Sequence, residues 1–196
     1  MHSRLILATG VPGAGVSTVL KTIEKRGKVK FNYLNFGDIM LKVGKQREYV
    51  ESRDQIRRLP VRKQKELQLL TAVEIQEKGE QLYVVDTHCT IKTPEGYFPG
   101  FPRTILEQLD PVAIVLVEAD ADEIAKRRST DTTRKRDAED AETIREHQAM
   151  NRSAAMSYAA FIGSPVLIIQ NRNNKLDEAA EAVEKIFEAA GLGKWG

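Results

Sequence analysis

The stretch Gly10-Val-Pro-Gly-Ala-Gly-Val-Ser17 decides the fold of this chain. Its spacing is that of a phosphate-binding loop, in which glycine, four residues and a second glycine precede lysine and then serine or threonine. Every defined position fits except one, because Val16 stands where lysine is expected. Glycines let backbone amides turn inward, and the helix that follows directs its positive end to the same place. The stretch therefore predicts an anion cradle that can form without the lysine.

The residues on either side of the loop support this interpretation. Arg4–Thr9 is a short apolar run, typical of a central strand buried in a parallel sheet, and Ser17–Lys25 has apolar residues at helical spacing before Gly27. The alternative is a tight turn that merely needs glycine, but a strand before the loop and a helix after it favour phosphate binding. We expect ATP to contact Gly10, Val11, Pro12, Gly13, Ala14, Gly15, Val16, Ser17 and Thr18.

Four more apolar segments have the length and composition of strands. Helix-forming segments alternate with them, so we expect an α/β fold with a parallel sheet of about five strands. The segments are Val29–Phe36, Gln81–Asp86, Pro111–Val117 and Pro165–Ile169.

Between and after the strands, three segments predict long helices and one predicts a loop. Ser52–Lys78 is a helical insertion interrupted at Pro60, and Thr93–Arg103 has three prolines and two glycines, which favour a loop. The two remaining helices are expected over Glu142–Phe161 and Asp177–Ala190.

Composition limits the class of protein further. The chain has 196 residues, which suits one compact domain, and a formal net charge of +2, which by itself does not indicate a nucleic-acid partner. Its one cysteine, Cys89, excludes an internal disulfide and suits the cytoplasm. We find no membrane span or signal segment, and we expect a cytoplasmic protein.

Asp86 ends a hydrophobic strand, where a carboxylate would hold Mg²⁺ together with the Ser17 hydroxyl. The alternative for Asp86 is a helix cap. His88 follows two residues later and could orient a substrate, although a lone histidine is more often structural.

Cations follow elsewhere in the chain. Ala125–Asp137 is rich in arginine, and beside a phosphate-binding loop it predicts a closing lid, whereas alone it would be read as a solvated helix face. Asp38 and the pair Arg57-Arg58 could line an acceptor pocket, with surface ion pairing as the alternative. Arg103, within Gly100-Phe-Pro-Arg-Thr104, is a further candidate anion ligand.

Several sequence blocks, in this order, resemble the archaeal type of adenylate kinase. The resemblance implies a three-layer P-loop kinase fold, a helical nucleoside-monophosphate-binding insertion at about 38–80 and a lid at about 127–140, all within one domain, 1–196. It also implies Mg²⁺-dependent conversion of ATP and AMP into two ADP, and a homotrimer. The blocks are Asn35–Met40, Arg53–Pro60, Val85–His88, Ile91–Gly100 and Asp131–Asp137.

The same resemblance implies roles for individual residues. Arg134, Arg136 and Arg152 would act on the transferring phosphoryl group, and Arg57 would bind the acceptor. The segment around Arg103 is similar to the acceptor motif of bacterial adenylate kinases, although its distance from Asp86 is unusual for that group.

Two other functions stay open at this point. A kinase of another nucleoside monophosphate would share these motifs, and a nucleotide-binding switch or assembly protein with little turnover would explain Val16. Nucleic-acid binding has little support, because no stacking aromatic residues interleave the arginines of 125–137.

Overall fold

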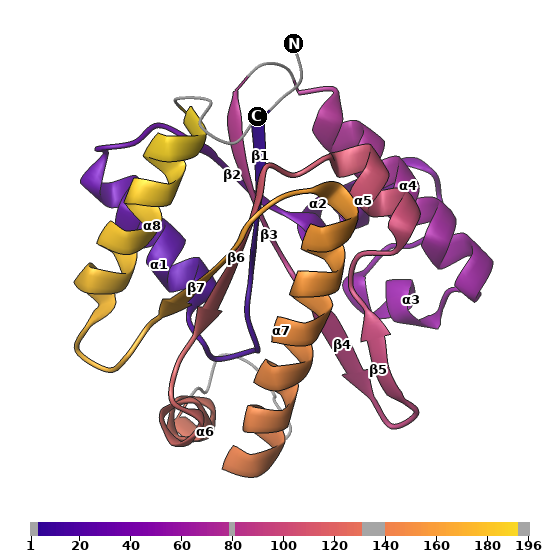
Figure 1. Ribbon diagram of the computed structural model, residues 1–196. Coiled ribbons are helices and arrows are strands. Elements are labelled where there is room, and N and C mark those ends of the chain that lie inside the picture. The colour runs from indigo at the N-terminus through magenta and orange to yellow at the C-terminus, as the bar shows by residue number, and fades with distance from the viewer. Residues whose placement is uncertain (1–3, 79–80, 131–139, 192–196) are drawn as a thin grey trace.

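The structure is a computed structural model that describes residues 4–78, 81–130 and 140–191, without the side chain of Arg57. Its main sheet has five parallel strands in the order β2-β3-β1-β6-β7, as predicted, and β1 is central (Figure 1). The strands are β1 (Arg4–Thr9), β2 (Asn32–Asn35), β3 (Leu82–Thr87), β6 (Ala113–Glu118) and β7 (Val166–Gln170).

Helices cover both faces of this sheet and give three layers, as predicted (Figure 1). Alternation along β1 explains the two cores, because Leu5 and Leu7 face one layer while Ile6 and Ala8 face the other. One layer consists of α1 (Val16–Arg26) and α8 (Leu176–Gly191). The other contains α2 (Phe36–Gln46), α4 (Val61–Gln76), α5 (Arg103–Leu109) and α7 (Ala141–Ile162).

The segment predicted as a helical insertion is helical, and its helices are interrupted at Pro60, as predicted. α3 (Arg53–Arg58) ends before Leu59, which is extended, and Pro60 is the N-cap residue of α4. A residue before proline is biased away from helical geometry, so the break follows from the sequence. None of the described helices is long and apolar enough to cross a membrane.

The predicted loop over Thr93–Arg103 is wrong for its first half. Strands β4 (Thr90–Thr93) and β5 (Gly96–Pro99) form an antiparallel hairpin. The Thr93 hydroxyl accepts a hydrogen bond from the Glu95 amide at 3.2 Å, and Gly96 has a φ of 124°, which glycine adopts without strain. The sequence is therefore well suited to this turn. Pro99 lies at the end of its strand, where proline is tolerated.

Candidate active site

The loop between β1 and α1 needs its glycines for physical reasons. Gly13 and Gly15 have φ values of 92° and 95°, in the left-handed region that glycine adopts without strain. A Cβ atom on Gly10 would lie 2.4 Å from the carbonyl oxygen of Val117 on the neighbouring strand β6. Side chains are therefore excluded at the first glycine by close approach, and at the other two mainly by backbone conformation.

Three side chains hold the loop from outside through its carbonyl groups. Asn171, just after β7, donates Nδ2 to Ala14 O at 2.8 Å and is buried. Arg127 and Arg128 of α6 (Ala121–Thr130) donate to Ala14 O at 3.5 Å and to Pro12 O at 2.7 Å. With these carbonyls engaged on the outside, the loop is fixed in a conformation that leaves its interior to backbone amides.

None of these three contacts was expected from the sequence. Asn171 carried no motif, and only the chain path from β7 places it against the loop. The sequence grouped Arg127 and Arg128 with a lid or a solvated helix face, but here they bind the loop backbone. The spacing of charges cannot distinguish a phosphate ligand from a side chain that braces the phosphate-binding backbone.

Val16 does not replace the missing lysine. Its side chain is 9% exposed and packs with the α1-side core, which includes Ile6, Val19 and Leu20. A valine has no donor for a phosphate oxygen, so positive charge near the donor phosphates must come from other residues.

Ser17 and Asp86 meet, as the magnesium prediction requires. The Ser17 hydroxyl at the start of α1 donates to Asp86 Oδ2 at 2.9 Å, at the carboxyl end of β3. A hydroxyl and a carboxylate are hard oxygen ligands that suit Mg²⁺. The Tyr33 hydroxyl donates to the same oxygen at 2.8 Å, which the sequence did not predict. Burial, and then the negative charge of Asp86, raise the pKa of Tyr33 above its ordinary value.

A charged cluster lies at the end of β2, beside this pair. The Asn35 side chain caps α2 by accepting from the Asp38 amide at 3.1 Å, and it also accepts from Arg53 at 2.9 Å. Arg53 forms an ion pair with Asp38 at 2.5 Å, although both side chains are exposed. The predicted residue Asp38 thus lies at the sheet edge as expected, with Arg53 as a partner that the site prediction omitted.

His88 follows β3 and is exposed, so it lies next to the site edge with its side chain accessible. Behind it the hairpin is packed tightly, since a Cβ on Gly100 would lie 1.8 Å from the carbonyl oxygen of His88. Cys89 is buried, and this burial raises its pKa to about 12, which leaves the thiol protonated and inert at neutral pH.

Arg152 lies at the expected edge but is engaged with a carboxylate. It pairs with Glu118 at the end of β6 through two hydrogen bonds, of 2.8 and 2.5 Å. The Glu118 side chain is 4% exposed and the Arg152 side chain 53%. Glu118 directly follows Val117, whose carbonyl oxygen approaches Gly10, so the residue that holds Arg152 is next to the loop in the fold.

Arg103 contacts residues away from the Arg152–Glu118 pair, and its role in the acceptor pocket stays a prediction. Its guanidinium stacks over the Phe161 ring at 5.1 Å, and it pairs with Glu107 on its own helix. α7 runs away from the site edge, and Phe161 is nine residues beyond Arg152, roughly 13 Å further along the helix. A local proline-arginine motif cannot reveal which end of the sheet its helix occupies.

The remaining predicted residues are described in part or not at all. Arg134 and Arg136 lie outside the described residues, and Arg57 is described only by its backbone in α3. Their roles stay predictions.

The fold and the loop define a P-loop kinase, a class of α/β nucleotide-binding proteins. A family model described as "AAA domain" matches residues 9–145. Solved structures share the fold at low identity: a shikimate kinase from Bacteroides thetaiotaomicron has a TM-score of 0.55 at 14% identity, with 94% of this chain and 98% of that chain covered.

Curated relatives define the family within this class. An adenylate kinase from Methanopyrus kandleri is 50% identical over 93% of this chain and 97% of its own length. One from Methanothermobacter thermautotrophicus is 45% identical over 94% and 100%, and one from Methanocaldococcus jannaschii is 46% identical over 96% and 100%. The chain belongs to the archaeal adenylate kinase family.

Proposed function

We propose that the chain transfers the terminal phosphoryl group of ATP to AMP, reversibly and with Mg²⁺, giving two ADP. An oxygen of the AMP phosphate attacks the γ-phosphorus, and the bond from that phosphorus to the β-phosphate oxygen breaks. The observation that carries the proposal is the Ser17–Asp86 contact of 2.9 Å at the mouth of the phosphate-binding loop. Phosphoryl transfer needs positioning and charge stabilisation rather than a covalent intermediate.

The residues divide this work between donor and acceptor. Gly10–Thr18 would hold the donor phosphates through backbone amides, and Ser17 and Asp86 would hold the cation, which neutralises phosphate charge when bound. Asp38, Arg57 and His88 would form the acceptor side, where the exposed Asp38–Arg53 pair adds a second cation.

We assign the transferring phosphoryl group to Arg134, Arg136 and Arg152. Arg152 starts from its pair with Glu118, whose hydrogen bonds, and then whose negative charge, raise the pKa of Arg152. Because guanidinium groups match phosphate oxygens in a two-pronged geometry, converging arginines can supply the charge that Val16 lacks.

A coupled assay for ADP from ATP plus AMP tests the activity, and CMP, UMP and GMP in place of AMP test the acceptor base. The expected result is turnover with AMP as the preferred acceptor, abolished by chelation of divalent cations. Tight ATP binding without turnover would instead favour a nucleotide-binding switch or assembly protein, the function that Val16 makes worth testing.

Val16→Lys restores the lysine that the loop motif lacks and tests how much the loop depends on this position. Backbone amides carry the cradle, so ATP binding should persist in this variant. Loss of all ATP binding, measured by calorimetry, would show that the buried side chain of Val16 matters more to the loop than its carbonyl contacts.

We also propose a cytoplasmic homotrimer. Residues 153–171 contain no charged residue, and this run includes the exposed side chains of Met156, Phe161 and Ile168 beside β7, an edge strand of the sheet. Exposed apolar side chains of this kind favour contact between subunits. Light scattering after size exclusion should give three times the chain mass, and Met156→Lys with Ile168→Lys should reduce it to that of one chain.

A further inference from the structure

Tyr33 reaches the proposed magnesium site from a neighbouring strand. Asn35 of β2 pairs in register with Asp86 of β3, and Tyr33 precedes Asn35 by two residues, so the three side chains lie on one face of the sheet. The Tyr33 hydroxyl donates to Asp86 Oδ2 at 2.8 Å. Ser17 donates to the same oxygen at 2.9 Å, so two hydroxyl groups fix one oxygen of a buried carboxylate.

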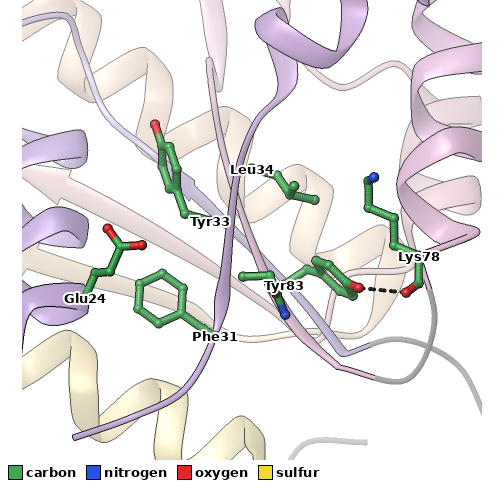
Figure 2. Close-up of a pocket in the computed structure, with 7 residues that line it drawn as sticks. Glu24, Phe31, Tyr33, Leu34, Lys78 and Tyr83 are labelled. Carbon is green, nitrogen blue, oxygen red and sulfur yellow. Dashed lines mark hydrogen bonds between the residues drawn. The ribbon is translucent and has the colours of Figure 1, made fainter. Parts of the chain in front are cut away.

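The surroundings of Tyr33 show that this contact is directional. The ring lines a cavity of about 560 Å³ at the open edge of β2, together with Glu24 and Phe31. Figure 2 shows the Tyr33 hydroxyl pointing away from both of those side chains. Tyr83 lines the same cavity from the other side of β2 and donates to the Lys78 carbonyl at 2.8 Å (Figure 2). Two tyrosines thus share one cavity, but only Tyr33 contacts the site.

We propose that Tyr33 is a positioning residue that fixes Asp86 for the divalent cation. With Oδ2 held by two hydroxyl groups, Asp86 would hold the cation, directly or through water, with its other oxygen, Oδ1. A hydroxyl has one hydrogen and two lone pairs, so Ser17 would be able to hold the cation while it still donates to Asp86. The proposal rests on the proposed function, because it assumes the magnesium site formed by Ser17 and Asp86.

The test measures binding of a non-hydrolysable ATP analogue without acceptor, once with Mg²⁺ and once with EDTA. The ratio of the two affinities is the coupling between cation and nucleotide. Tyr33→Phe should lower this ratio roughly tenfold, the usual effect of losing a partner that orients a metal ligand. The affinity in EDTA should stay unchanged, because the amide cradle does not involve Tyr33. A merely structural role would weaken binding equally under both conditions.

Tyr83→Phe is the matched control, since it removes a hydroxyl from the same cavity without touching Asp86. It should leave the coupling ratio at the wild-type value. In an Asp86→Asn background, the additional change Tyr33→Phe should have no further effect on the ratio, because the carboxylate that it orients is gone.

Three results would overturn the inference: an unchanged ratio in Tyr33→Phe, an equal loss in EDTA, or the same loss in Tyr83→Phe. Failure of the proposed function would give a different set of results. In that case the wild-type chain itself shows no gain in analogue affinity with Mg²⁺ and no ADP from ATP plus AMP.

Discussion

The proposed donor and acceptor halves of the site edge are built in different ways. On the donor side, Asn171 is buried and holds Ala14, and Gly10 lies so close to Val117 that no side chain fits. On the acceptor side, the Arg53 and Asp38 side chains are 51% and 70% exposed and pair with each other. The donor half is held by buried contacts, whereas the acceptor half consists of charges at the surface.

This difference separates stability from specificity. Buried contacts to a backbone are costly to remove, while exposed ion pairs contribute little to folding. We therefore expect donor-side substitutions to affect the fold and ATP together, and acceptor-side substitutions to affect AMP alone.

The largest effect is expected for Gly10→Ala. The new Cβ would lie 2.4 Å from the Val117 carbonyl oxygen, so β6 or the loop must move. We expect the free energy of unfolding to fall by about 3 kcal/mol, as in severe overpacking, and ATP affinity to fall more than about tenfold. Chemical denaturation and calorimetry measure the two quantities.

Gly191→Ala is the control, because a Cβ there meets nothing within 4 Å. It should change neither quantity. If Gly10→Ala kept the ATP affinity of the wild type, the donor loop would tolerate displacement. The proposed difference between the donor and acceptor sides would then be wrong.

A smaller effect on both quantities is expected for Asn171→Ala. The change removes the donor to Ala14 O and leaves a buried carbonyl with one fewer partner, so the free energy of unfolding should fall by about 1–2 kcal/mol. ATP affinity should fall by a factor of about five as the loop loosens. Asn32→Ala is the control, because Asn32 at the start of β2 contacts Gln81 and Leu82 but neither the loop nor Arg127. A loss of stability with unchanged ATP affinity would show that the bracing of Ala14 serves folding only.

The features that could be predicted from the sequence are those that local patterns specify. The sheet and the Ser17–Asp86 contact were predictable, because strand periodicity and the loop motif are local patterns, and parallel strands bring their carboxyl ends to one edge. Asn171 and Tyr33 were not, because neither residue belongs to a motif that marks it as part of the site. The β4–β5 hairpin was missed because prolines and glycines signal turns without indicating whether strands flank them.

On the acceptor side we expect Arg53→Ala to act on AMP alone. The exposed pair with Asp38 contributes at most about 1 kcal/mol to folding, so stability should hardly change. The KM for AMP should rise about threefold to fivefold, as one cation of the cluster is lost, with the KM for ATP unchanged. Lys42→Ala is the control, because it breaks an exposed pair with Glu74 on the same helix layer, away from the end of β2. An equal rise in both KM values would mean that the two halves are not independent.

The smallest effect is expected for Arg103→Ala. This variant tests whether the function of Arg103 follows from its similarity to a motif or from its position in the structure. The residue lies within a segment similar to a bacterial acceptor motif, yet its guanidinium lies over Phe161, far along α7 from the Arg152–Glu118 pair. Removal costs one exposed ion pair and one exposed cation–π contact, about 0.5–1 kcal/mol together, and the KM for AMP should change less than about twofold. Steady-state kinetics with AMP varied at saturating ATP measures this. A tenfold rise in that KM, with stability unchanged, would place Arg103 on the acceptor side during turnover and would require α5 to move toward the site edge.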